Sequence, residues 1–241
     1  MRAIFLADAH LQEPTDHNYK VMLQFLDGLI GSVDTIFILG DFFEFWIGYP
    51  GIPFQRYIPV VESLKRLTDS GVKLVYFEGN HDFHMGDYFR DVLDATIYKK
   101  GVALNIDGKV VDLSHGDQMS SDFGYKMLRL LLHSFVTKWL TYIVPPKTAD
   151  RIAVWMGKKS KGRYVSQNLD DTYRTLALSY AKKAFAKGSD IVISGHMHVA
   201  MEESIGSDKV IILGDWISLF TYAEWIDGEV TLRRYGFDSG V

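Results

Sequence analysis

The sequence predicts an α/β protein in which two β-sheets pack face to face, with helices on their outer sides. Strand-like and helix-like segments alternate over residues 3–77, which is typical of a parallel sheet covered by helices. From residue 102 onward the predicted strands come in hairpins, which indicates antiparallel pairing. Early parallel units followed by late antiparallel ones favour two sheets over one.

The first part of the chain contains three apolar, β-branched runs, at 3–7, 35–39 and 72–77, which we predict to be buried strands. A helix is predicted between each neighbouring pair, at 18–30 and at 55–69. In the first of these helices the apolar residues recur at helical spacing: Val21, Met22, Phe25, Leu26, Leu29 and Ile30.

The later part contains two hairpin signals. Strands 102–106 and 110–113 flank Asp107-Gly108, and the last hairpin turns at Asp227-Gly228. Two further strands are predicted at 191–195 and 210–213. Residues 120–185 are predicted to be helical, with a break at Pro145-Pro146, and to form a cap inserted into a single domain that spans residues 1–241.

Composition narrows the class of protein. The chain has 241 residues, enough for one domain with an appendage, and no cysteine, which excludes disulfides and thiolate metal sites. We expect a cytoplasmic protein without a signal peptide or a membrane-spanning helix. The net charge is -4, yet residues 126–163 contain nine Lys and Arg and one acid, Asp150. This local excess predicts an anionic partner.

Potential metal ligands follow the predicted strands, where open α/β sheets place their ligands. Mixed nitrogen and oxygen donors suit Mn, Fe or Zn, and a carboxylate commonly bridges two ions about 3.5–4 Å apart. Each motif by itself is also compatible with ordinary packing, and we expect the other histidines, His17, His84 and His133, at the surface or in structural roles. The seven candidates are Asp8, His10, Asp41, Asn80, His115, His196 and His198.

The order of these motifs, Asp8-x-His10, Gly40-Asp41, Gly79-Asn80-His81-Asp82, His115-Gly116 and Gly195-His196-x-His198, resembles the calcineurin-like metallophosphoesterase family. The resemblance implies a four-layer α-β-β-α sandwich of two mixed sheets. It implies two divalent ions, expected to be Mn with Fe or Zn as alternatives, which supply a hydroxide nucleophile. Asp8, His10 and His198 would hold one ion, and Asn80, His115 and His196 the other. Asp41 would bridge both, and His81 would assist the leaving oxygen.

The run from Gly40 to Gly48, and Asp122-x-Gly124-Tyr125 after His115-Gly116-Asp117, resemble the UDP-2,3-diacylglucosamine diphosphatase branch of lipid A biosynthesis. That resemblance implies cleavage of a pyrophosphate to 2,3-diacylglucosamine 1-phosphate and UMP, with the acyl chains held beneath the cap. It implies a protein peripheral to the inner face of the inner membrane. The implied substrate contacts are Asn80, His81, Asp122, Tyr125, Ser160 and Lys161.

Three alternatives stay open at this point. This chain has His81 where the branch typically has Arg, so a soluble phosphodiesterase or nucleotide pyrophosphatase of the same fold is an alternative. A nuclease is a less favoured alternative: the basic segment could follow a nucleic-acid backbone, but aliphatic more than aromatic residues separate the basic ones, so no nucleic-acid partner is expected. A metal-free scaffold is the least favoured reading. We also expect the aromatic residues after Asp41, from Phe42 to Trp46, to form a floor for the cap and an acyl substrate.

Overall fold

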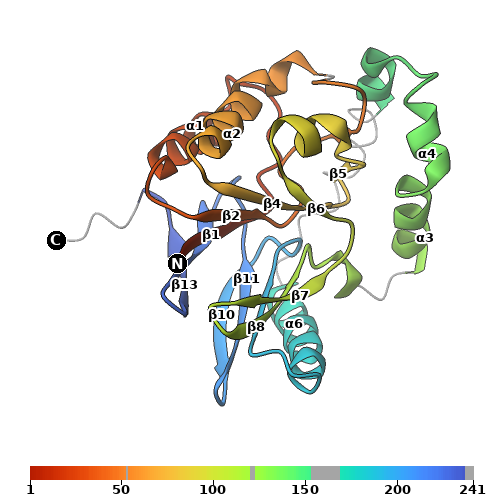
Figure 1. The fold of residues 1–241 in the computed structure, drawn as a ribbon. Helices are drawn as coiled ribbons and strands as arrows, with labels where there is room; N and C mark the ends of the chain where they lie inside the picture. The colour runs from red at the N-terminus through yellow and green to blue at the C-terminus, as the bar shows by residue number, and fades with distance from the viewer. Residues whose placement is uncertain (53, 120–122, 153–168, 237–241) are drawn as a thin grey trace.

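The computed structural model describes residues 1–52, 54–119, 123–152 and 169–236. It confirms the predicted sandwich of two sheets with helices outside. Figure 1 shows helices α1 and α2 above the first sheet, α6 below the second, and α3 and α4 at the side of the sandwich. In the part of the chain that is described, no helix is both long and apolar enough to cross a bilayer.

The first sheet has six strands in the order β13-β12-β1-β2-β4-β6. Its four strands from β1 to β6 run parallel, and β12 and β13 add an antiparallel edge. The bounds are β1 Arg2–Leu6, β2 Thr35–Ile38, β4 Lys73–Phe77, β6 Thr96–Tyr98, β12 Thr221–Ile226 and β13 Glu229–Arg234. A separate two-stranded pair joins β3, Trp46–Ile47, to β5, Asp82–Phe83.

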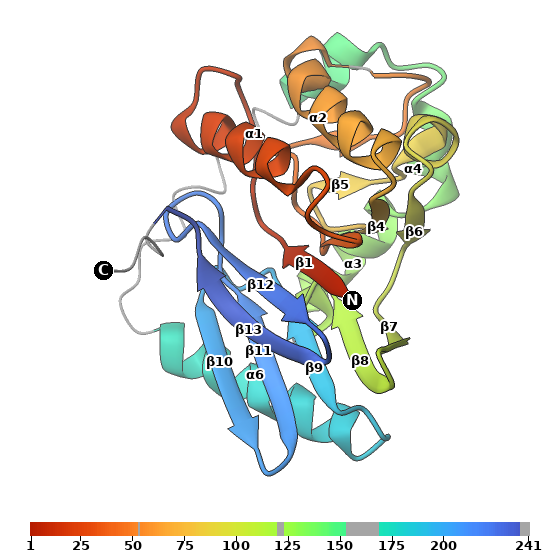
Figure 2. The ribbon, with the colours of Figure 1, turned by 60° about the vertical axis from the view of Figure 1, so that its left-hand side comes forward.

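The second sheet has five strands in the order β10-β11-β9-β8-β7 (Figure 2). Both predicted hairpins are present, and the turn residues of both, Asp107-Gly108 and Asp227-Gly228, have positive φ, as a two-residue type I′ turn requires. The bounds are β7 Val102–Ile106, β8 Lys109–Ser114, β9 Ile191–Ser194, β10 Ala200–Ile205 and β11 Asp208–Leu213.

Side chains along β1 point alternately to the two faces of the first sheet, and this alternation explains how the helices and the second sheet are layered on it. Ala3 and Phe5 face the second sheet, where they join one apolar cluster, whereas Ile4 and Leu6 face helices α1 and α2 in another. A third cluster packs α6 on the second sheet through small residues such as Ala177 and Ala181. The covering helices are α1 His17–Leu29, α2 Ile58–Asp69 and α6 Leu169–Phe185.

The helices at the side of the sandwich are α3, Phe123–Leu132, and α4, Phe135–Leu140. The Ser134 hydroxyl caps α4 by accepting a hydrogen bond from the Thr137 N–H. Residues 146–152 are helical again, so the chain breaks at the two prolines as predicted. Three shorter helices are η1 Gln55–Tyr57, η2 Tyr88–Val92 and η3 Asp117–Met119.

The aromatic run after Asp41 differs from the expectation of a floor for the acyl substrate. Phe42, Phe43 and Trp46 are fully buried in the core beneath α1 and α2, and the Trp46 indole N–H donates to the carbonyl of Met85. Only Phe45 of the run is partly exposed. These rings pack on one another and on Tyr57 and Phe89, so their role is to support the loop that carries Asp41.

Candidate metal centre

The seven predicted ligands converge at one edge of the sandwich, although they are spread over 190 positions of sequence. Each follows the carboxyl end of a strand: β1, β2, β4, β8 or β9. The parallel strands of both sheets deliver their loops to this same edge, because parallel neighbours end together.

Asp8, His10 and His198 form the first group. The Asp8 Oδ1 lies 3.9 Å from His10 Nε2 and 3.7 Å from His198 Nε2. The other Asp8 oxygen is held by the backbone N–H of His196 at 2.6 Å, so Oδ1 is the oxygen that faces the histidines. The side chains of all three can place a ligand atom around one point.

Asp41, Asn80, His115 and His196 form the second group. The His115 Nε2 lies 3.4 Å from Asp41 Oδ2, 3.1 Å from the amide oxygen of Asn80 and 3.2 Å from His196 Nδ1. Because His115 Nε2 lies within 3.4 Å of all three atoms, it points into the space between them.

Asp41 lies between the two groups. Its Oδ2, which faces His115, is also 3.8 Å from His10 Nε2, so one oxygen is close to both groups. Its Oδ1 accepts a hydrogen bond from the His81 N–H at 2.8 Å. Asp82, which sequence reasoning left without a role, fixes the backbone of this loop by accepting from the N–H groups of Asp41 and Phe42 at 2.9 and 2.6 Å. A buried carboxylate directed at backbone donors leaves no local pattern in the sequence.

Five of the seven candidate ligands adopt unusual backbone conformations. Asp8, His10, Asp41, His196 and His198 all have φ between 45° and 70°, in the left-handed region that non-glycine residues rarely occupy. Such strain costs of order 1–3 kcal/mol per residue and persists where the surrounding fold imposes it, which is commonly a functional site.

Glycines allow the loops to approach one another. A Cβ at Gly79 would lie 2.2 Å from Asp41 Oδ1, one at Gly40 would lie 2.7 Å from His115 Nδ1, and one at Gly195 would lie 2.5 Å from Asp8 Oδ2. Each of these three positions therefore excludes a side chain because a candidate ligand occupies the space.

The donor set fits divalent ions. A divalent ion about 2.0–2.2 Å from each donor keeps neighbouring donors roughly 3 to 4 Å apart, which matches the distances in both groups. Two of the atoms, Asp8 Oδ1 and His10 Nε2, are buried and make no hydrogen bond to any described residue. Buried polar atoms without partners are costly, and a cation between them would remove that cost.

The outward nitrogens of three histidines are held by fixed partners. His115 Nδ1 donates to the carbonyl of Leu39 at 2.8 Å, His10 Nδ1 lies 3.4 Å from Glu44 Oε2, and His198 Nδ1 lies 3.6 Å from Asp215 Oδ2. Such partners select the tautomer whose Nε2 is free for a metal. Asp215 is in turn anchored by backbone N–H groups, including that of Ser218 at 2.7 Å.

The electrostatics of the site are strongly perturbed. Burial alone would raise the pKa of Asp41, but the charges of His115 and His81 outweigh burial and hold it well below its usual range. Burial lowers the pKa of His196 to about 3, with His115 adding to the effect. Burial also opposes protonation of His115, but the nearby carboxylates of Asp41 and Asp8 outweigh it and raise the pKa of His115 well above its ordinary value. At Asp215 burial opposes ionisation, but hydrogen bonds from His198 and the backbone lower its pKa to about 2.

His81 is partly exposed beside these groups. Its Nδ1 donates to the carbonyl of Glu44 at 2.8 Å, and its ring stands edge-on to the ring of His10, with the two centroids 4.7 Å apart. Of the other predicted substrate contacts, Asp122, Ser160 and Lys161 lie outside the described residues, and so does the side chain of Tyr125.

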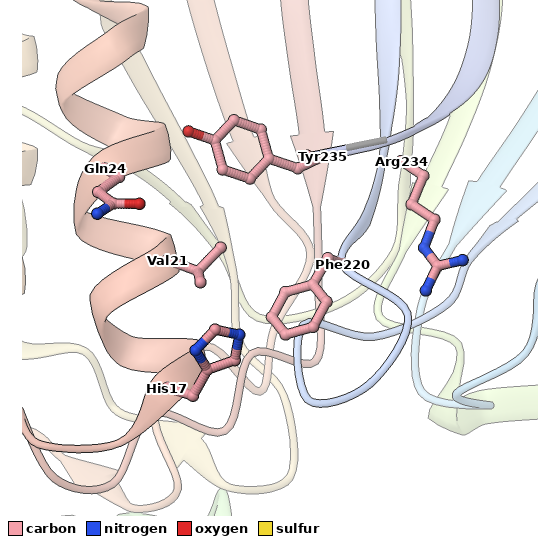
Figure 3. A pocket seen from close by; sticks show the side chains of 7 residues that line it. His17, Val21, Gln24, Phe220, Arg234 and Tyr235 are labelled. Carbon is pink, nitrogen blue, oxygen red and sulfur yellow. The ribbon is translucent and has the colours of Figure 1, made fainter. Parts of the chain in front are cut away.

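A separate hollow of about 330 Å³ lies between α1 and the end of β13. Figure 3 shows His17 and Gln24 of α1 facing Phe220, Arg234 and Tyr235 across it. None of its lining residues is a predicted ligand, so the candidate metal centre is a different place on the molecule.

The sequence profile of the calcineurin-like phosphoesterases matches residues 1–200. The chain belongs to this calcineurin-like phosphoesterase family. It is therefore a metal-dependent phosphoesterase, and the reading as a metal-free scaffold is not supported. Divalent ions are the cofactors of the family, in agreement with the two groups of ligands at the strand ends.

Among similar proteins, the UDP-2,3-diacylglucosamine hydrolase of Pseudomonas entomophila is 31% identical over 88% of this chain and 90% of its own length. The protein of the same name from Pseudomonas aeruginosa PAO1 is 30% identical over 90% and 91%. A solved structure described as a novel archaeal phosphodiesterase aligns with a TM-score of 0.54 at 14% identity, covering 97% of this chain and 99% of its own. The structural likeness shows the shared fold alone.

Proposed function

We propose that this calcineurin-like phosphoesterase hydrolyses the pyrophosphate of UDP-2,3-diacylglucosamine to 2,3-diacylglucosamine 1-phosphate and UMP. Two relatives named as hydrolases of that compound match about nine-tenths of the chain at about 30% identity. The structural observation that favours a lipid substrate is the exposed apolar surface of α3 and α4, which lies beside the candidate metal centre.

That surface is unusual for a protein in water. Phe135 is 83% exposed, Tyr142 72% and Leu130 67%. A protein in water rarely exposes so many large apolar side chains on neighbouring helices unless they bind something. Among the side chains of this segment that the structure describes, the large apolar ones that are exposed are Met127, Leu130, Leu131, Phe135, Val136, Trp139, Leu140, Tyr142, Ile143 and Ile152.

Acyl chains are the ligand whose chemistry matches this surface. We propose that the insertion, residues 120–185, serves as the cap, and that its exposed apolar side chains take up the acyl chains. Exposed basic residues, Lys138, Lys147 and Arg151, are interspersed with them and would face anionic head groups. The same combination supports a peripheral position on the inner face of the inner membrane.

The reacting pyrophosphate would lie over the candidate metal centre. Asp8, His10, His198 and Asp41 would hold one divalent ion, and Asp41, Asn80, His115 and His196 the other. When bound, such ions activate water at neutral pH and neutralise charge on phosphoryl oxygens. His81, held through Nδ1 by the Glu44 carbonyl, would present Nε2 to the leaving oxygen as a hydrogen-bond donor, and Asn80 would contact the phosphoryl group.

The test is release of UMP from UDP-2,3-diacylglucosamine by the purified protein with Mn²⁺ in detergent. The Asp41→Ala variant should lose activity. Replacing Phe135 and Trp139 together by Ser should slow turnover of the lipid at least tenfold. The matched control is Ile226→Ser, which removes an exposed apolar side chain from β12 and should change nothing.

A second candidate is a phosphodiesterase or nucleotide pyrophosphatase acting on water-soluble substrates, which is favoured by His81 at the position where the lipid-hydrolysing branch typically has Arg. It predicts rapid turnover of short nucleotide diesters without detergent. It also predicts no effect of the Phe135 and Trp139 replacements. If micromolar enzyme released no UMP from UDP-2,3-diacylglucosamine, the first candidate would be rejected and this second candidate would replace it.

A further inference from the structure

Helix α3 and the residue that follows it carry two polar side chains that are turned toward the sheets. Arg129 and His133 are four positions apart, and the helical hydrogen bond from the His133 N–H to the Arg129 carbonyl, 2.9 Å, keeps them in register. They therefore project from the same side of the helix. The outward side of α3 exposes Leu130 and Leu131.

Arg129 is tied to the loop that carries His115. Its guanidinium pairs with the carboxylate of Asp117, which is fully buried and lies two residues after His115. The same guanidinium reaches the carbonyl of Lys99 at 3.4 Å. Separating a buried carboxylate from the cation that pairs with it is strongly destabilising. The Arg129–Asp117 pair therefore favours the arrangement in which α3 packs against the loop that carries His115, which we call the docked position of α3.

His133 is tied to the loop that carries Asn80. Its Nε2 donates to the carbonyl of Gly79 at 3.2 Å, and its Nδ1 lies 3.2 Å from Oε2 of Glu78, a buried carboxylate. His84, beyond the same loop, donates from Nε2 to the carbonyl of Ser134 at 3.1 Å. His84 is buried and His133 is half-buried, and both are structural residues at the junction of α3 and α4.

Both of these contacts fall on loops that carry ligands of the second group, Asn80 and His115. Gly79 directly precedes Asn80, and Asp117 directly follows the His115-Gly116 pair. We propose that Arg129 and His133 are positioning residues for the second metal ion, coupling the docking of the α3–α4 segment to the orientation of Asn80 and His115.

The consequence is reciprocal. If docking of α3 orders Asn80 and His115, then an ion bound by these two ligands must also favour the docked position of α3. The inference rests on the two-ion centre and not on the identity of the substrate. Its tests use metal binding and helix protection in place of lipid turnover, so its failure is distinct from failure of the proposed reaction.

The first test counts Mn²⁺ bound per chain at fixed free Mn²⁺ and records its electron paramagnetic resonance spectrum. Wild type should bind two ions with the spectrum of a coupled pair. Arg129→Ala and His133→Ala should weaken one site at least tenfold, the effect typical of removing an outer partner of a ligand, and give the spectrum of an isolated ion. His133→Gln, which keeps a donor for the Gly79 carbonyl, should restore part of the loss.

Matched controls are Arg90→Ala and His17→Ala, which remove the same residue types away from the centre and should leave both sites intact. Two coupled ions retained in both Ala variants would overturn the proposal. So would equal weakening of both sites, the same loss in the controls, or fewer than two ions in wild type.

A second test needs no variant and so does not depend on the folding of one. Amide hydrogen exchange of residues 123–144 is compared between Mn²⁺-loaded and chelated wild-type protein, with α6 as internal reference. Exchange of 123–144 should quicken at least tenfold on metal removal, whereas α6 should change little. Equal exchange of 123–144 in both states would overturn the coupling.

Discussion

Gly79→Ala should disable the metal centre by adding a single methyl group. The new Cβ would lie 2.2 Å from Asp41 Oδ1 and 2.6 Å from Asp41 N, whereas ordinary contact begins at 3.4 Å. The carboxylate would have to retreat by about 1.2 Å, but the hydrogen bond that Asp41 N donates to Asp82 resists this movement. Metal–ligand distances in well-formed sites agree with their standard values to about 0.2 Å, so a shift of this size would disrupt coordination.

The expected loss of activity is therefore at least 100-fold, since a displacement of about 1 Å in a catalytic group costs that much. The accompanying loss of stability should be smaller, about 1–3 kcal/mol for overpacking. The assays are Mn²⁺ affinity by calorimetry, hydrolysis of a chromogenic phosphodiester, and thermal unfolding.

Gly28→Ala is the matched control because it is the same chemical change in open space. Gly28 lies within α1 with ordinary φ, and a Cβ there would have nothing within 4 Å, so alanine should stabilise the protein by about 0.5–1 kcal/mol. If Gly79→Ala bound Mn²⁺ and turned over substrate within twofold of Gly28→Ala, the close approach of Gly79 and Asp41 would not matter for the centre.

Other contacts of the centre and of the core can each be tested by one change. Asp215→Asn should weaken Mn²⁺ binding about 10–100-fold by loosening His198, measured by calorimetry; unchanged affinity would show that the 3.6 Å contact does not orient the imidazole. Trp46→Ala should cost about 3–5 kcal/mol of unfolding free energy in urea, because the side chain is fully buried; a loss below about 1 kcal/mol would contradict its place in the core. Chelation should lower the melting temperature of wild type but not of Asp41→Ala, by scanning calorimetry; an equal shift in both proteins would mean that the stabilising ion binds elsewhere.

The layers of the fold were predictable because the signals are local and strong. Buried strands such as 35–39 are continuous apolar runs, and the two Asp-Gly turns identify their hairpins. The strands that were missed, β3, β5, β6 and β10, have weaker signals. β10 lies at a sheet edge with exposed and half-buried residues in alternation, and β3 and β5 have two residues each. Such pairs depend on tertiary packing more than on their own sequence.

The aromatic run after Asp41 shows where sequence reasoning misassigned a role. An aromatic run such as Phe42, Phe43 and Trp46 looks the same in sequence whether it lines a substrate site or belongs to the core. Only the residues that surround it in the fold distinguish these two roles. Burial beneath α1 and α2 assigns them to the core. The opposite holds for α3 and α4. Their apolar composition is compatible with two helices that pack on one another, but in the structure Phe135 and Trp139 are exposed.

The sequence by itself determined which chemistry is available, because ligand types at strand ends and their order along the chain are properties of the residues alone. Only the tertiary structure decided how those residues are held. Glu44 orients the imidazole of His10, and Asp215 orients that of His198. Asp82 fixes the backbone of the Asp41 loop. Each of these partners lies between 17 and 41 positions along the chain from the residue that it contacts. Contacts across such separations leave no periodic or local signal, so they emerge only when the sheets bring the strand ends together.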